Sequence, residues 1–385
     1  MPMFGKDSFG RLGAAIALCA TLAVPAQAQV QMRYSVGFPS GAPTEAARLY
    51  ADAVKKFTDG SVNVRVYDTA LLSLPEMSGG VGKGVSEIGY VLGPYWPAEF
   101  PHVNMASELS MLLALQPDPG VKAGLAYAGA FAEFILFNCP ECVADFAKQN
   151  QVFTGATVSP PYTLQCTKPM RTLADLKGAR LRVGGAAWAR WARQMGASPV
   201  TMPGNEMFEA LKQKVVDCTV LAAAELSAWN LKEVVTDTNI EIPGGVFSGS
   251  SINVNRDAWR KLTEAQRTGM MRAAAVMSAQ STFRYRAYSR RDIEQFTAKN
   301  GRLNKSDPEL IKASRAAIEA DIPNVAANYA KQHNVKRADA LVESMRPLIA
   351  KWSKLVDNVE DVDALTDLYW REIYSKVDVK SYGMQ

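Results

Sequence analysis

The segment from Asp175 to Asp217 constrains the fold more than any other part of this 385-residue chain. Alternation of small or apolar residues with arginines predicts a strand over 179–183, and Gly184 and Gly185 separate it from the next element. The elements expected after the glycines are a helix (186–195), a strand (200–202), a helix (206–214) and a strand (216–221). This alternation is typical of α/β proteins with a mostly parallel sheet, whose ligands bind outside the carboxyl ends of the strands.

Arg182 is expected at such a carboxyl end, just before the start of the next helix. A guanidinium in this position combines a bidentate donor with the unpaired backbone N–H groups of a helix N-terminus. Both features favour a carboxylate ligand. The alternative interpretation is that Arg182 pairs with an acidic residue at the protein surface.

The same segment carries a resemblance to a known family. The motifs are, in order, Asp175-Leu-Lys-Gly, Arg182-Val, Gly196-Ala, Pro199, Glu206-Met-Phe-Glu-Ala-Leu and Val216-Asp217. This ordered series resembles the solute-binding subunits of tripartite ATP-independent periplasmic (TRAP) transporters of the dicarboxylate-binding (DctP) type. The resemblance extends from about Met32 to about Gln266.

The resemblance implies a two-lobed fold like that of type II periplasmic binding proteins, with a long helix between the lobes and a helical C-terminal extension. Lobe I is expected over 29–158, with 247–287 returning to it, and lobe II over 159–246, with 288–385. In this family the chain crosses between the lobes near Ser159-Pro160-Pro161, the predicted hinge, and again near Gly244-Gly245-Val246-Phe247.

The long helix also has its own signal in the sequence. Thr263-Glu-Ala-Gln266 forms a capping box, and the helical pattern continues to Lys299, before Asn300-Gly301. A helix of this length measures about 50 Å at 1.5 Å per residue, longer than one small domain is wide. Three further helices are predicted, over 308–332, 338–356 and 362–374.

The N-terminus has the pattern of a secretory signal peptide. Lys6 and Arg11 precede an apolar run over 12–24, and Ala26-Gln27-Ala28 provides small residues at a cleavage site. We expect cleavage after Ala28 and a periplasmic location. The net charge of +5 is mild and the basic residues are scattered, so a nucleic-acid partner is not expected.

Four cysteines remain after the predicted cleavage, and an exported protein is expected to pair them. The sequence allows three full pairings. We favour a structural bridge from Cys139 or Cys142 to Cys166, with Cys218 as a buried free thiol. The alternative is a redox pair, because Cys139 and Cys142 form a Cys-x-x-Cys motif at a helix start.

Residues that an enzyme would need are scarce. The chain contains only His102 and His333, which are predicted in different lobes and do not have a metal-ligand spacing. The sequence has no nucleophile elbow, zinc-protease motif or dinucleotide fingerprint. We therefore predict a binding protein that is not an enzyme and uses no metal or cofactor.

Five residues are predicted to form the binding site. Arg182 would anchor a carboxylate, and Asn205, which matches a pocket position of the family, would orient it. Tyr162, Trp188 and Tyr95 would form the walls, although Trp188 has an alternative role in the core and Tyr95 in packing under its loop.

Two departures from the family pattern suggest the ligand. Tyr162 stands near the place of a second arginine that some members carry, and Leu221 replaces a polar residue that often follows the Val-Asp motif. These changes favour a monocarboxylate with an apolar or aromatic body. The predicted function is capture of a small organic acid anion for delivery to the membrane subunits of a TRAP transporter. The alternatives are a periplasmic thiol-disulfide redox protein and a ligand-sensing subunit of the same fold.

Overall fold

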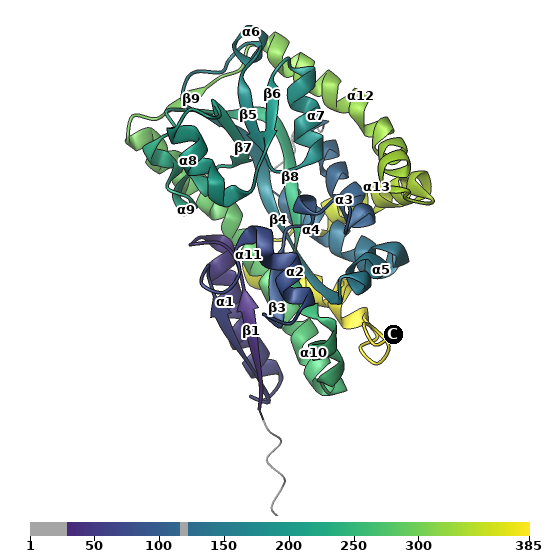
Figure 1. Ribbon diagram of the computed structural model, residues 1–385. Coiled ribbons are helices and arrows are strands. Elements are labelled where there is room, and N and C mark those ends of the chain that lie inside the picture. The colour runs from purple at the N-terminus through teal and green to yellow at the C-terminus, as the bar shows by residue number, and fades with distance from the viewer. Residues whose placement is uncertain (1–28, 116–121) are drawn as a thin grey trace, which may run out of the picture.

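A mixed β-sheet lies at the centre of the molecule (Figure 1). The computed structural model describes residues 29–115 and 122–385, so the predicted signal peptide lies outside the described residues. Within these ranges nine strands pair in the order β2-β1-β3-β8-β4-β7-β5-β6, and β9 pairs with β8. The strands are β1 (Val30–Ser35), β2 (Val62–Tyr67), β3 (Ile88–Val91), β4 (Gln151–Cys166), β5 (Arg180–Val183), β6 (Ser198–Thr201), β7 (Cys218–Ala222), β8 (Asp237–Asn255) and β9 (Arg302–Asn304).

Each end of the sheet is a parallel unit that forms the core of one lobe. In lobe I, β1 pairs in parallel with β2 and β3. In lobe II, β5 pairs in parallel with β6 and β7. The connecting helices include α1 (Ala42–Phe57) and α2 (Met77–Gly82) in lobe I, and α7 (Ala186–Gln194) and α8 (Met207–Lys212) in lobe II. The predicted two-lobed α/β fold is confirmed.

Two long antiparallel strands, β4 and β8, connect the lobes and run through both of them (Figure 1). The prediction of two separate strands on either side of 159–161 is wrong, because β4 is continuous from Gln151 to Cys166. Its pairing with β8 shifts register between Val158 and Leu164 instead. A proline has no N–H to donate, and strands accommodate it at such irregularities. The crossing is therefore a bulged stretch of continuous sheet.

Helix α11 (Glu264–Ala298) has 35 residues and begins with the predicted capping box of Thr263 and Gln266. At 1.5 Å per residue it is about 50 Å long. It packs against α1 in lobe I and reaches α9 (Glu225–Ala228) and β9 in lobe II. The long helix predicted between the lobes is present.

The three predicted C-terminal helices are α12 (Pro308–His333), α13 (Ala338–Leu355) and α14 (Val362–Glu372). Their positions differ in part from the expectation that 288–385 belongs to lobe II. Helix α13 packs on α4 (Ala123–Glu133) and α14 packs on α11, whereas α12 contacts both α3 (Pro101–Glu108) of lobe I and α7 of lobe II. Trp352 of α13 is fully buried beside Gly129 of α4, where the missing side chain leaves room for its ring. The C-terminal helices thus extend along both lobes.

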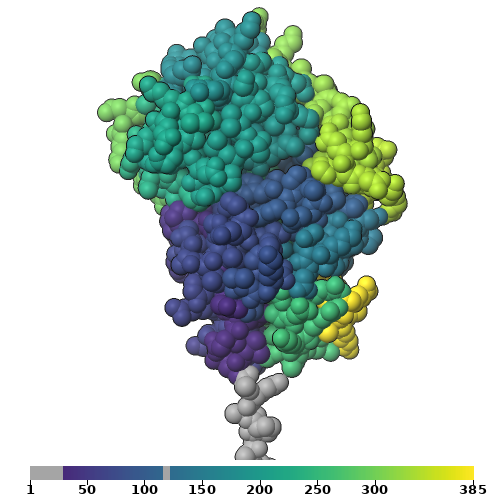
Figure 2. Space-filling model, viewed as in Figure 1, coloured from purple at the N-terminus to yellow at the C-terminus, as the bar shows by residue number. Residues whose placement is uncertain are grey.

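The remaining helices are shorter and lie between these elements. They are α3 (Pro101–Glu108), α5 (Pro140–Lys148), α6 (Leu173–Leu176) and α10 (Arg256–Lys261), with single turns that include η2 (Gly93–Tyr95) and η5 (Gly204–Glu206). Among the described residues, no helix combines the length and apolar character needed to cross a membrane. In the space-filling view the teal part of the chain rests directly on the blue part, so the lobes are in contact on this face (Figure 2).

Two disulfides pair all four cysteines of the described chain, Cys139 with Cys142 and Cys166 with Cys218. The expected bridge to Cys166 from Cys139 or Cys142 is therefore wrong, as is the free thiol at Cys218. Cys166 and Cys218 are direct partners in the register of β4 and β7, with Cα atoms 4.0 Å apart. The pairing follows from strand register, which cysteine spacing does not reveal.

We expect Gly129→Ala to lower the free energy of unfolding by about 1–3 kcal/mol, because overpacking a filled core forces side chains to move. A Cβ at this position would overlap the buried ring of Trp352, whose indole Nε1 is hydrogen-bonded to Glu133 at 2.6 Å. Urea unfolding of residues 29–385 measures the change. The matched control is Gly79→Ala in α2, where a Cβ meets nothing within 4 Å. Equal stability of the two variants would contradict this account of α13 packing.

Thiol chemistry checks the disulfide pairing. Residues 29–385, unfolded in denaturant without a reductant, should show no thiol that reacts with a maleimide, because both pairs are bonded. Reduction should then release four thiols, which serves as the control. Peptide mapping should recover Cys166 linked to Cys218. A peptide linking Cys139 or Cys142 to Cys166 would restore the pairing first expected.

Candidate functional site

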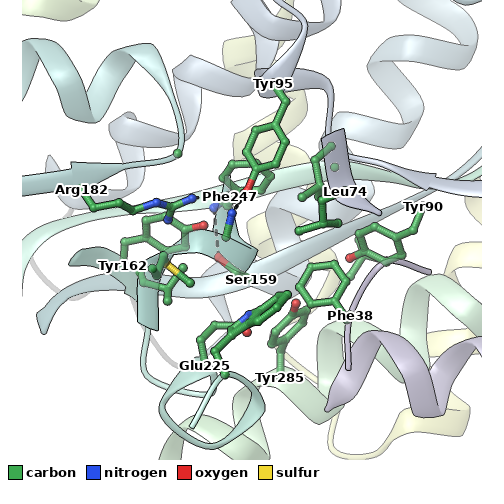
Figure 3. A pocket seen from close by; sticks show the side chains of 18 residues that line it. Phe38, Leu74, Tyr90, Tyr95, Ser159, Tyr162, Arg182, Glu225, Phe247 and Tyr285 are labelled. Atoms are coloured by element: carbon green, nitrogen blue, oxygen red, sulfur yellow. Dashed lines mark hydrogen bonds between the residues drawn. The ribbon is translucent and has the colours of Figure 1, made fainter. Parts of the chain in front are cut away.

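A small cavity lies where the two lobes meet, and its internal volume is about 40 Å³. This is room for about three water molecules. Lobe I, lobe II, the crossing strands and α11 all contribute to its lining (Figure 3). The lining includes Phe38, Leu74, Tyr90, Tyr95, Tyr162, Arg182, Gly204, Leu221, Glu225, Phe247 and Tyr285. A ligand in this cavity would contact both lobes.

Arg182 reaches the cavity from near the carboxyl end of β5, as the sequence predicted, and is only 1% exposed. Its guanidinium donates to the carbonyl oxygen of Met202, from Nε at 3.0 Å and from Nη2 at 2.8 Å. No acidic side chain of the described residues forms an ion pair with it. A buried cation without a counterion is costly.

The alternative interpretation of Arg182 as a surface ion pair is thus wrong. Arg180, two residues earlier on the same strand, has that role. Its side chain is exposed and its Nη2 lies 3.2 Å from Oδ1 of Asp217. Residues two apart on a strand point to the same face of the sheet, so Arg180 and Arg182 share a face. The difference in burial between them comes from position along the strand, because Arg182 lies closer to the lobe interface.

Tyr95 joins the two lobes at the cavity. It belongs to η2 of lobe I, and its hydroxyl accepts hydrogen bonds from Arg182 Nη2 at 3.3 Å and from the backbone N–H of Gly204 at 2.9 Å. Both donors belong to lobe II. Figure 3 shows its ring directed toward Arg182. The lobes are therefore closed on each other at the predicted anchor.

An aromatic stack forms one wall of the site. Tyr162 of β4 stacks on Trp188 with ring centroids 4.5 Å apart, and Phe247 of β8 lies parallel to both. Tyr162 and Phe247 line the cavity, whereas Trp188 lies outside the lining and donates from Nε1 to the carbonyl of Gly244 at 3.1 Å. Trp188 thus supports the wall from behind.

The structure separates Asn205 from the other predicted site residues. Its side chain is exposed and is not part of the cavity lining, although its neighbour Gly204 is. Leu221, which replaces a polar residue of the family pattern, does line the cavity. Four of the five predicted residues, Arg182, Tyr162, Trp188 and Tyr95, gather in or directly behind the cavity.

Glu225 is the main functional candidate that sequence reasoning missed. It follows β7 at the start of α9, lines the cavity and is 5% exposed. Burial raises the pKa of this carboxyl to about 7, and the charge of Asp292 acts in the same direction, while Tyr285, Trp229 and Arg182 lower it. The available signal was a single acidic residue directly after an apolar strand and three alanines.

Two tyrosine hydroxyls accompany this carboxyl. Tyr90 of β3 and Tyr285 of α11 line the cavity, and burial raises the pKa of both phenols above their ordinary value. Both hydroxyls therefore remain neutral near pH 7 and able to donate. In Figure 3, Glu225 and Tyr285 lie on the side of the cavity away from Tyr95.

Two α/β lobes with a cavity between them have the architecture of the periplasmic-binding type. Residues 160–329 match the family described as bacterial extracellular solute-binding protein, family 7 (DctP). The DctP-type resemblance carried by the sequence motifs is therefore confirmed. Most of lobe II, the returning β8 and α11 fall within the matched segment.

Known structures share the fold over most of the chain. A Bordetella pertussis extracytoplasmic solute receptor that binds pyroglutamic acid, DctP7, is 23% identical, with a TM-score of 0.67 over 82% of this chain and 99% of the receptor. A TRAP solute-binding protein from Bordetella bronchiseptica with bound mandelate is 20% identical, with a TM-score of 0.69 over 84% and 99% of the two chains. A marine metagenome TRAP protein with 3-hydroxybenzoate is 19% identical, with a TM-score of 0.69 over 84% and 99%.

A relative from Haemophilus influenzae, described as an uncharacterized protein, is 22% identical over 142 residues. The match covers 36% of this chain and 42% of the relative, so the chain spans about two fifths of the length of the curated relative it matches.

The raised pKa of Glu225 predicts a specific pH dependence of stability. The pKa of this carboxyl is about 7 in the folded protein and near 4.5 in the unfolded chain. Its contribution to stability is therefore fully present below about pH 4.5 and is lost as the pH rises through about 7. The full loss is on the order of 3 kcal/mol. Glu225→Gln should therefore gain stability relative to the wild type as the pH rises from 4.5 to 8, measured by urea unfolding of residues 29–385.

The control for this measurement is Glu233→Gln, which changes an exposed glutamate a few residues further along the chain. Its unfolding curves should follow the wild type at every pH. Parallel pH profiles for Glu225→Gln and the wild type would show that Glu225 titrates normally.

Proposed function

We propose that this chain is a periplasmic solute-binding protein that captures a small organic acid anion and delivers it to the membrane subunits of a TRAP transporter. The observation that carries the proposal is the buried guanidinium of Arg182, which faces a closed cavity and has no counterion among the described residues. A ligand carboxylate supplies the missing charge and accepts charge-assisted hydrogen bonds from the guanidinium. The signal peptide with cleavage after Ala28 is part of this proposal.

In the proposed function, each residue of the binding site has a distinct role. Arg182 anchors the carboxylate, and Tyr95 accepts from Arg182 on one side and lies against the ligand on the other. Tyr162 forms the wall, and Trp188 holds Tyr162 in place through their stacking contact. The orienting role first given to Asn205 is left out, because its exposed side chain lies outside the cavity lining.

The lining favours a compact monocarboxylate with an apolar body. Leu221, Phe247 and Tyr162 offer mostly apolar surface, and Arg182 is the single basic side chain among the described lining residues. The related structures named above hold pyroglutamate, mandelate and 3-hydroxybenzoate, each of which carries one carboxylate. Tighter binding of succinate than of every monocarboxylate would contradict this ligand class.

Binding is coupled to lobe closure through contacts that cross the interface. Tyr95 contacts Arg182 next to the cavity, and at the periphery Arg190 of α7 pairs with Glu108 of α3 at 2.5 Å. Arg190 also pairs with Asp321 of α12 at 2.8 Å. A carboxylate on Arg182 lowers the cost of burying that cation, so it stabilises the closed form. The closed form then presents the surface that the membrane subunits recognise.

The redox alternative is not favoured. Cys139 and Cys142 are fully buried and bonded to each other, whereas thiol-disulfide exchange needs an attacking thiolate to reach a sulfur atom. The matching family also consists of solute-binding proteins. The disulfide at the start of α5 is best explained as structural.

Arg182→Ala tests the anchor. We expect affinity for organic acids to fall at least about 30-fold, because truncating one partner of a buried charge pair typically costs 2–5 kcal/mol. A thermal-shift screen of pyroglutamate, mandelate, 3-hydroxybenzoate and succinate identifies which acids bind. Calorimetry then measures the affinities of those acids for the wild type and the variant. The variant should stay folded, since it removes a buried charge without a counterion.

The matched control is Arg180→Ala, which removes an exposed arginine from the same strand. Its affinity should stay within about twofold of the wild type, since surface ion pairs contribute little. Wild-type affinity in Arg182→Ala would refute the anchor role.

A further inference from the structure

The cavity has a second polar end, formed by Glu225. Strands β5 and β7 are parallel neighbours, so Arg182 near the end of β5 and Glu225 just beyond the end of β7 reach the same edge of the sheet. Both line the cavity, and the side chain of Glu225 is buried. A cation and an acid therefore face one enclosed space.

Helix α11 fixes the backbone on both sides of Glu225. The N–H of Ala224 donates to Ser289 Oγ at 3.1 Å, and the N–H of Ser227 donates to Asp292 Oδ2 at 3.0 Å. Asp292 is itself fully buried and paired with Arg291 at 2.9 Å. The turn that carries Glu225 is thus held by α11 itself, and a residue fixed in this way is preorganised for recognition.

The carboxyl of Glu225 is incompletely satisfied. Its Oε2 atom is buried and has no hydrogen-bond partner among the described residues. No hydrogen bond or ion pair joins Arg182 to Glu225 among the described residues; the guanidinium donates from Nε and Nη2 to Met202 and Tyr95 instead. A buried acceptor without a donor costs about 1–3 kcal/mol. Tyr285 and Trp229 interact with the same carboxyl and lower its pKa, so it is the Oε2 atom that stays open to a donor from the cavity.

We propose that Glu225 selects acids that carry, besides the carboxylate on Arg182, a hydrogen-bond donor at the other end, such as a hydroxyl, amide N–H or ammonium group. The inference rests on the proposed function and adds the ligand's second group. Between the two ends the lining is mostly apolar, with Leu74, Met207 and Leu221. Above its pKa of about 7 Glu225 is ionised, and a second carboxylate then meets a like charge, so the same residue disfavours dicarboxylates at such a pH.

Calorimetry with matched acids tests the selection. The probes are benzoate against 3-hydroxybenzoate, and butyrate against 4-hydroxybutyrate and 4-aminobutyrate, with glutarate as the dicarboxylate. Ligand-free protein, residues 29–385, should bind the donor-bearing member of at least one set about tenfold or more tightly than its plain partner, because leaving a buried acceptor unpaired is costly. Glutarate should bind more weakly than that preferred acid.

Two substitutions separate the acceptor from its charge. Glu225→Leu removes the acceptor and should abolish the preference for the donor-bearing acids. Glu225→Gln keeps an acceptor oxygen and the side-chain shape, so it should retain the preference for hydroxyl acids and lose any preference for the ammonium acid. Glu233→Gln, at an exposed position, should leave every preference unchanged.

The outcomes distinguish this inference from the proposed function. Two outcomes overturn the inference and leave the proposed function standing, provided that carboxylate binding depends on Arg182. In one, the protein shows no preference within the matched sets. In the other, the preference survives Glu225→Leu. Failure of every acid to bind protein shown by denaturing mass spectrometry to be ligand-free overturns both.

Discussion

The burial of the Arg182 guanidinium is the interaction on which the rest of the site depends. The carbonyl of Met202 and the hydroxyl of Tyr95 hold the group at the cavity, yet neither neutralises its charge. The following backbone must also make room for it, because a Cβ at Gly184 would lie 3.2 Å from Nη2. A ligand carboxylate would offset this cost, and its attraction to the guanidinium is strongest where the lobes exclude water.

The aromatic wall of the cavity, formed by Tyr162 and Phe247 with Trp188 behind them, lies where the chain crosses between the lobes. Tyr162 and Phe247 lie on β4 and β8, in the stretch where the pairing of these strands is irregular. Trp188 of lobe II stacks on both rings and donates to Gly244, which has a positive φ of 75°. Side chains that line the cavity are therefore attached to the part of the backbone where the pairing of the two long strands shifts register.

Local sequence patterns predicted most helices and strands of this protein. The continuity of the long strands and the disulfide pairing depend instead on long-range strand register. The repeated strands and helices of 175–217, the capped helix α11 and the position of Arg182 follow from periodicity and end signals. The continuity of β4 through two prolines and the Cys166–Cys218 pair depend on which strands are neighbours. Glu225 was missed because the turn that carries it is held by Ser289 and Asp292 of α11, and these contacts join residues 65 positions apart in the chain.

The separate anchoring of Arg182 and Glu225 explains how one cavity keeps a basic and an acidic group available. Two such groups would form an internal ion pair if they were free to meet, and that pair would compete with any ligand. Arg182 is instead held by Met202 and by Tyr95 of lobe I, while the turn of Glu225 is held by Ser289 and Asp292 of α11. Each group is thus fixed by a different element, so the guanidinium of Arg182 and the Oε2 atom of Glu225 both stay available to a ligand.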